Sequence, residues 1–216
     1  MAIALRKMHL SAKKVAPRST EITRYWDPHL ARRAAKLKPG EQYVSATDEM
    51  LVTVAGSTCV LCLRDPEEGL VAMLNFSLPT KGLSTLDASG HAQAERYGKA
   101  QLDKLFGALR KEGVNFQALE ATLIGGSGDF SEDQRAIEDT LALTRRYLAT
   151  YWVSIAAEYL GTAHPKKVYL NLNDVSPQVR VLQEVSSTVA SREKHYAISL
   201  RAGWLLGNRK TSMQFS

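Results

Sequence analysis

The stretch Met50-Leu-Val-Thr-Val-Ala-Gly-Ser-Thr-Cys-Val-Leu-Cys-Leu-Arg-Asp65, followed by Leu70-Val-Ala-Met-Leu-Asn-Phe76, decides the fold of this 216-residue chain. Its three apolar runs are separated by residues 55–58 and 65–69, which carry the small and polar residue types typical of turns. Such short runs, rich in Val, Leu and Cys and closed by turns, predict three consecutive β-strands.

The segments around this stretch add further strands and two helices. We expect strands at residues 43–46, 119–124, 153–159, 168–172 and 179–185. A helix is expected over 94–112, where Leu102, Leu105, Phe106 and Leu109 follow helical spacing. A second helix is expected from Ser131, whose spacing to Gln134 fits a capping box. This order predicts an α+β fold, an α/β sandwich of mixed β-sheet layers with helices packed on the outside.

The composition is that of an ordinary globular protein, with 44% apolar and 23% charged residues. This balance excludes a wholly disordered or collagen-like chain. No apolar run reaches the roughly 18 to 20 residues that a membrane span requires, and no apolar signal segment opens the chain. We therefore expect a cytoplasmic protein.

The positive charge is concentrated at the N-terminal end. Residues 1–40 carry ten Lys or Arg against Glu21 and Asp27, a net charge of +8, whereas the other 176 residues carry 18 basic and 20 acidic side chains. Such a basic arm is able to bind nucleic acid, an anionic membrane or an acidic protein, and the alternative is a solvated leader. We divide the chain into a basic N-terminal arm (1–40), a domain (41–185) and a C-terminal extension (186–216).

The two cysteines, Cys59 and Cys62, are the only ones in the chain. A Cys-x-x-Cys pair can be a redox site or half of a metal site. These two lie within a predicted strand, and neither a second cysteine pair nor ligand-like histidine spacing accompanies them. We interpret them as small buried hydrophobic residues and expect no metal.

Five segments in this order resemble the CheD family, the chemoreceptor glutamine deamidases of bacterial chemotaxis. They are Thr53-Val-Ala-Gly-Ser-Thr-Cys-Val-Leu-Cys-Leu-Arg-Asp-Pro66, Ala72-Met-Leu-Asn-Phe-Ser-Leu-Pro79, Arg96-Tyr-Gly98, Leu119-Glu-Ala-Thr-Leu-Ile-Gly-Gly126 and Pro165-Lys-Lys-Val-Tyr169. The resemblance covers residues 40–185. It implies a cysteine nucleophile, an activating histidine and no cofactor, with a thiolate attacking the glutamine carboxamide.

The sequence departs from this family at the catalytic positions. Gly56 and Ser57 match the family motif Gly-Ser-Cys-Val, but Thr58 stands at the cysteine position and Asn75 at the histidine position, 17 residues later. The family motif Gly-x-Arg-Asn reads Glu138-Asp-Thr-Leu141 here. We expect Thr58 and Asn75 to be a polar pair without activity. The candidate binding residues by this resemblance are Thr53, Gly56, Ser57, Gly125 and Gly126.

Three hypotheses about function follow. The first is a catalytically degenerate CheD-like protein that binds chemoreceptor cytoplasmic domains or, by the same resemblance, a CheC-type phosphatase. The second is an active protein-glutamine deamidase that uses Cys59 as nucleophile and His91 as base, which requires a bulge because neighbouring strand residues face opposite sides. The third is a basic-arm binder of nucleic acid or a membrane surface.

Overall fold

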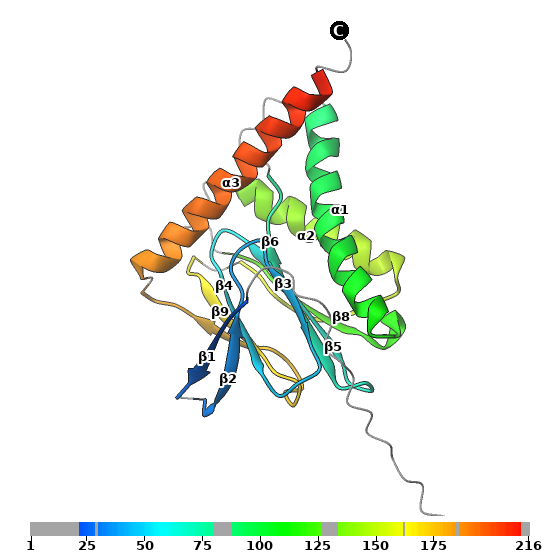
Figure 1. Ribbon diagram of the computed structural model, residues 1–216, viewed down its shortest axis with the longest axis vertical. Helices are drawn as coiled ribbons and strands as arrows, with labels where there is room; N and C mark the ends of the chain where they lie inside the picture. The colour runs from blue at the N-terminus through cyan, green and yellow to red at the C-terminus, as the bar shows by residue number, and fades with distance from the viewer. Residues whose placement is uncertain are drawn as a thin grey trace, which may run out of the picture.

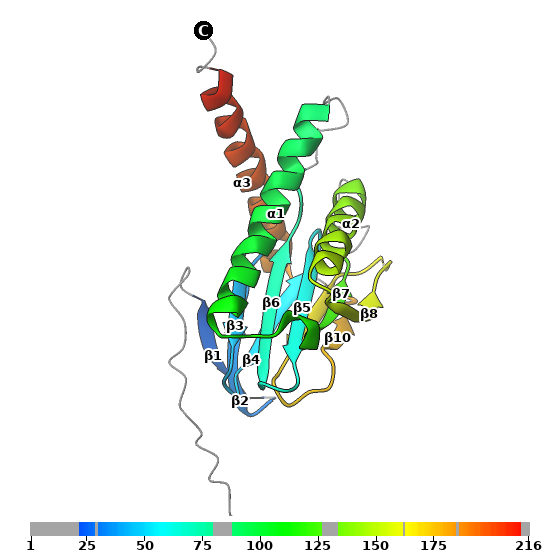
Figure 2. The same ribbon diagram turned by 90° about the vertical axis from the view of Figure 1, so that its right-hand side faces the viewer.

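The computed structural model describes residues 22–28, 30–79, 88–126, 134–161, 163–184 and 186–212. They form an α+β sandwich, which confirms the predicted fold class. Two five-stranded mixed sheets pack against each other, and two helices cover the outer face of one of them (Figures 1 and 2).

The helix-covered sheet has two of the three predicted consecutive strands, β5 (Cys59–Asp65) and β6 (Leu70–Phe76), near its centre. Its spatial order is β3 (Gln42–Ser45), β6, β5, β7 (Glu120–Ile124) and β8 (Ser154–Tyr159). All neighbours run antiparallel except β7 and β8, which are parallel. The central strand β5 is therefore hydrogen-bonded at both edges. Its continuous apolar sequence fits burial on both faces.

The second sheet has one parallel pair, β2 with β4, and is otherwise antiparallel. Its spatial order is β1 (Thr23–Asp27), β2 (Arg32–Lys36), β4 (Met50–Ala55), β9 (Lys166–Leu170) and β10 (Gln178–Val181). The chain passes from this sheet to the other at residues 56–58, between β4 and β5.

The core lies in two layers, one on each face of the helix-covered sheet. Side chains alternate along a strand, so Cys59, Leu61 and Leu63 pack toward the helices. Val60 and Cys62 pack toward the second sheet. Two cysteines three positions apart in a strand therefore face opposite sides, and both are free thiols. They are small buried side chains, as their place in a strand suggested.

Three α-helices complete the described fold: α1 (Ala88–Lys111), α2 (Gln134–Thr150) and α3 (Ser187–Ser212). A 3-10 turn, η2 (Phe116–Ala118), precedes β7. The predicted first helix is present and begins earlier, at Ala88. The predicted capping residue of the second helix, Ser131, lies outside the described residues. Figure 2 shows α1 and α2 on one side of the sandwich, whereas α3 crosses one end of it (Figure 1).

The expected domain boundary near residue 40 does not match the sheet. Strands β1 and β2 precede it, and β2 pairs with β4. The boundary was placed too late because the two fully buried residues of β2, Ala34 and Ala35, lie between charged residues in the sequence. At the other end, the expected C-terminal extension contains one helix, α3. Within the described ranges, no helix combines the length and apolar content needed to cross a bilayer.

Candidate functional site

The loop from Gly56 to Thr58 joins the two sheets and meets the end of β7. A Cβ atom on Gly126 would lie 2.2 Å from the Gly56 carbonyl oxygen and 2.7 Å from that of Thr58. Only glycine allows this approach of two backbones. The structure thus brings together Gly56, Ser57, Gly125 and Gly126, four of the five candidate binding residues.

Thr58 and Asn75 are both fully buried, and their register places them on one face of the sheet. Asn75 is the partner of Val60, which lies two residues after Thr58. The Asn75 amide Nδ2 donates to Thr53 Oγ1 at 2.7 Å and to the Val54 carbonyl at 3.0 Å. Thr53 Oγ1 donates in turn to the Leu37 carbonyl at 2.9 Å. The fifth candidate binding residue, Thr53, therefore holds Asn75 in place.

Two polar atoms in this region lack a partner among the described residues, Thr58 Oγ1 and Asn75 Oδ1. Both atoms are shielded from solvent, and a buried polar atom without a hydrogen bond lowers stability. The structure keeps polar groups at both positions and leaves one hydrogen-bonding oxygen of each unused.

Cys59 lies on the opposite face of β5, within the apolar layer beneath the helices. Its Sγ donates to the Ile137 carbonyl at 3.5 Å. Burial raises the pKa of the Cys59 thiol to about 12, although a backbone hydrogen bond from Gly126 and the charges of Arg145 and Lys166 oppose this. The substitute base, His91, is exposed on α1, and no contact described for Cys59 involves it. Burial thus disfavours the thiolate form of Cys59, and no hydrogen bond within the described residues joins this thiol to a histidine.

Lys166, the first residue of β9, adds a buried positive charge beside this loop. Its Nζ donates to the Gly125 carbonyl at 2.8 Å, and burial lowers the pKa of its ammonium group. Sequence reasoning gave it no role, although it belongs to the Pro165-Lys-Lys-Val-Tyr169 motif.

A glutamate of α3, Glu193, contacts the loop from Gly56 to Thr58. Glu193 is only 5% exposed. Its Oε2 accepts hydrogen bonds from the Ser57 amide at 3.0 Å and the Ser57 hydroxyl at 2.6 Å. A Cβ on Gly56 would lie 2.8 Å from the Glu193 carboxyl carbon. Burial raises the pKa of this carboxyl, and the hydrogen bonds from Ser57 and Gly56 oppose the change without cancelling it.

Tyr196, three residues later, is the second buried anchor of α3. Its phenol oxygen accepts from the Ser77 amide at 3.3 Å and lies 3.5 Å from the Tyr97 hydroxyl. Its ring covers Gly40, where an added Cβ would lie 2.7 Å from Cε2. Burial raises the pKa of Tyr196 well above its usual value. Sequence reasoning missed both anchors, although Glu193 is the only acidic residue between positions 187 and 212.

The third departure from the family pattern, at residues 138–141, lies on α2 next to the same region. Thr140 is fully buried, and its hydroxyl accepts from the Leu78 amide at 2.9 Å and donates to the Ala136 carbonyl. Leu141 is a core residue. The Thr140 hydroxyl therefore links α2 by a hydrogen bond to the segment that follows β6.

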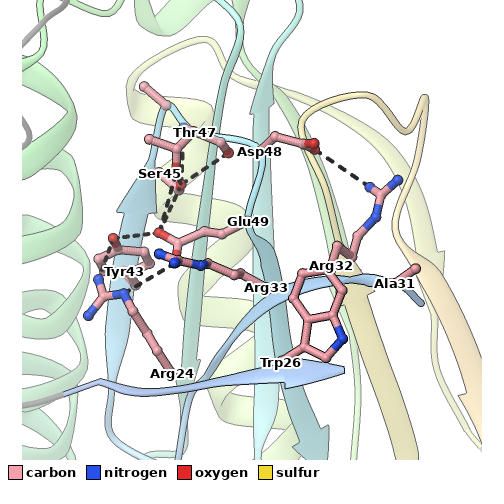
Figure 3. Close-up of a pocket in the computed structure, with 11 residues that line it drawn as sticks. Arg24, Trp26, Ala31, Arg32, Arg33, Tyr43, Ser45, Thr47, Asp48 and Glu49 are labelled. Carbon is pink, nitrogen blue, oxygen red and sulfur yellow. Dashed lines mark hydrogen bonds and ion pairs between the residues drawn. The ribbon is translucent and has the colours of Figure 1, made fainter. Parts of the chain in front are cut away.

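A cavity of about 600 Å³ lies between strands β1 and β2 and the residues from Tyr43 to Glu49 (Figure 3). Arg24, Tyr43 and Ser45 all donate to the buried Glu49 carboxylate, and Arg32 pairs with Asp48 at 3.6 Å. Two of the basic charges expected in a free arm are therefore neutralised by the loop before β4. None of the candidate binding residues lines this cavity. Across the part of the chain that is described, no cluster of three His, Cys, Asp or Glu side chains is suited to a metal ion.

Comparisons with known proteins agree on one family. Residues 78–181 match the family model described as CheD chemotactic sensory transduction. A probable chemoreceptor glutamine deamidase CheD from Janthinobacterium sp. is 34% identical over 187 residues, covering 85% of this chain and 91% of the relative. The corresponding protein of Halorhodospira halophila is 31% identical over 196 residues, covering 89% and 91%.

Among solved structures, the hypothetical protein YfiH of Bacillus licheniformis gives a TM-score of only 0.36 at 12% identity, over 56% of this chain and 50% of that chain. That similarity is too low to support an argument. The sequence relatives are sufficient, because they match over nearly their whole length. The chain belongs to the CheD family of chemotaxis proteins.

Proposed function

We propose that this chain acts in chemotaxis by binding the cytoplasmic domain of chemoreceptors, and that its site no longer deamidates glutamine. The observation that carries the proposal is the identity of the two residues at the family's catalytic positions, Thr58 and Asn75. A threonine hydroxyl is barely ionised at neutral pH and needs a neighbouring base, and an asparagine amide does not accept a proton.

The contacts of Cys59 support the loss of activity. A thiol with a pKa of about 12 is almost fully protonated at neutral pH, and the thiolate is the reactive form. The thiol also faces the helices, whereas Thr58 and Asn75 lie toward the other sheet. An active Cys59 would require both a flipped strand residue and a new base.

The proposed partner follows from the names of the relatives, which describe probable chemoreceptor glutamine deamidases. A protein that keeps the fold and loses the nucleophile can still occupy the receptor surface. Such a protein acts in the cytoplasm and needs no cofactor. A CheC-type phosphatase is a second partner, suggested only by the sequence resemblance.

A competition experiment tests this function. A receptor cytoplasmic fragment is incubated with an active CheD relative, with and without this protein, and ammonia release is followed. We expect this protein to slow the reaction in proportion to its concentration, because it occupies the same surface without turnover. An unchanged rate at saturating concentration would refute the proposal.

The matched control is a chain without residues 1–20, which loses Arg6, Lys7, Lys13, Lys14 and Arg18 and no acidic residue. It should compete as well as the full chain. Competition that needs these residues and disappears with added salt would instead support the basic-arm hypothesis, since exposed charges are screened by salt.

A further inference from the structure

We propose that α3 is a built-in competitor for the site, with Glu193 occupying the Gly56–Ser57 loop in place of a side-chain carboxylate or carboxamide from a partner helix. The inference concerns the regulation of the binding site and rests on the proposed function for its partner.

The Gly56–Ser57 loop binds Glu193 as a carboxylate-binding loop binds a ligand. One carboxylate oxygen accepts from both the amide and the hydroxyl of Ser57. Gly56 has no side chain, and a Cβ there would overlap the Glu193 carboxyl group. The loop is thus shaped for the end of a Glu or Gln side chain.

Glutamate is also the correct chemical mimic for this loop. Its side chain has the same carbon atoms as glutamine and differs only by an oxygen in place of the amide nitrogen. Glu193 stands on a helix, so it presents this group as a helical partner would. It is the only acidic residue of α3, whereas Arg192 and Lys194 flank it.

The attachment of α3 is suited to release. Among residues 187–200, only Glu193 and Tyr196 are buried, and each is held through a polar atom. Ile198, on the same helix, is 53% exposed. Burial of a carboxylate carries a desolvation penalty that offsets part of its hydrogen bonding. Between residues 187 and 200, two side chains held through polar atoms fix the helix less firmly than a continuous apolar face would.

The buried oxygens of Thr58 and Asn75 give a second reason to expect another occupant. Thr58 follows Ser57 directly, and its Oγ1 has no partner among the described residues. Asn75 Oδ1 is likewise without one. With α3 docked, the region still contains hydrogen-bonding capacity that Glu193 does not use.

The first experiment measures the local opening of α3 in the absence of a partner. Amide hydrogen exchange is compared for the wild type, Glu193→Ala and the control Lys194→Ala, an exposed neighbour on the same helix. We expect the amides of residues 189–197 to exchange at least about tenfold faster in Glu193→Ala and at the wild-type rate in Lys194→Ala, since exchange follows local opening. Equal rates in all three proteins would overturn the proposal. If Glu193→Ala does not fold, Tyr196→Phe, which keeps the ring and removes the phenol, serves in its place with the same expected result.

The second experiment measures binding of the receptor cytoplasmic fragment to the same proteins by calorimetry. If α3 occupies the site most of the time, opening it should tighten apparent binding by about tenfold or more in Glu193→Ala and not in Lys194→Ala. Equal, measurable affinities for the wild type and Glu193→Ala would refute the competitor role and leave the proposed function standing. Binding to neither protein would refute the proposed function, while the exchange experiment still tests the docking of α3.

Discussion

Gly126 lies where the end of β7 meets the loop between β4 and β5. Replacing it with alanine should lower the free energy of unfolding by about 3 kcal/mol, because the added Cβ meets backbone oxygen atoms, which cannot move aside as a side chain would. Denaturation by urea measures the change. The matched control is Gly107→Ala in α1, where a Cβ meets no atom within 4 Å and should raise stability by up to about 1 kcal/mol. A neutral Gly126→Ala would contradict the close approach of these backbones.

Cys59 should be almost inert in the native protein. With a pKa of about 12, it should react with iodoacetamide at pH 8 about a thousandfold more slowly than the same cysteine in the unfolded chain, since only the thiolate reacts. Its burial slows the reaction further. Mass spectrometry of the alkylated peptide measures the rate, and Cys62 in the same peptide serves as the internal comparison. Rapid, selective modification of Cys59 would reopen its role as a nucleophile.

Part of the site could be predicted from local sequence alone. Strand alternation predicts that Cys59 faces away from Thr58, and the structure confirms this for a regular β5. The contact between Ser57 and Glu193 could not be predicted in this way, because the two residues are 136 positions apart. Nothing local to Glu193 distinguishes a buried carboxylate from one on a solvated helix face.

At the scale of elements, β2 should be an essential part of the sandwich. Ala35→Asp should destabilise the fold by about 3 to 5 kcal/mol, because it places an unpaired charge at a fully buried position. Arg33→Ala, at an exposed position of the same strand, should change stability by less than about 0.5 kcal/mol. Removal of residues 1–20 should also have little effect, since β1 begins at Thr23. A melting temperature unchanged by Ala35→Asp would contradict the observed sheet.

Strands β1 and β2 were not predicted because their short sequences contain many charged residues. Thr-Arg-Tyr-Trp-Asp and Arg-Arg-Ala-Ala-Lys offer no continuous apolar run, and only tertiary contacts show that two alanines are core residues. The three strands from Met50 to Phe76 were predictable because both of their faces are largely apolar. Arg24 and Arg32 of this basic segment pair with Glu49 and Asp48 in the loop before β4.

The docking of α3 should weaken as the pH rises. Burial raises the pKa of Glu193 above its ordinary value of 4.5, so the docked state binds a proton more tightly than the free helix does. The docked state is therefore favoured fully below that ordinary value, and this advantage is lost as the pH rises through the raised pKa. The charged groups near it are Lys36, Lys38 and Arg192, and Tyr196 lies beyond.

Hydrogen exchange of α3, corrected for the intrinsic rate, measures this dependence. We expect greater protection of residues 189–197 at pH 5 than at pH 8. Glu193→Gln removes the titrating group and keeps an acceptor oxygen, so it should remove most of the pH dependence. Protection that increases toward pH 8, or that changes equally in Glu193→Gln, would contradict the assignment to Glu193.

At the scale of the whole molecule, the site exists because the chain crosses between two sheets. β4 belongs to one sheet and β5 to the other, and residues 56–58 connect them. The C-terminal helix α3 crosses this end of the sandwich (Figure 1), and its Glu193 contacts Ser57. The sequence predicts the layers, but it does not predict the strand order or the two parallel pairs, β2 with β4 and β7 with β8. Those depend on which apolar faces meet, and several faces are similar in sequence.

We infer that this CheD-family protein binds chemoreceptors without deamidating them, and the mass of a receptor fragment tests this inference. A receptor cytoplasmic fragment is incubated with the wild type and with Cys59→Ser, and its mass is then determined. The wild type should leave every glutamine unchanged, since both catalytic groups are missing and losing one of a cooperating pair already removes most of the rate. An increase of about one mass unit per glutamine with the wild type, abolished by Cys59→Ser, would contradict the claim, because deamidation replaces an NH2 group with OH.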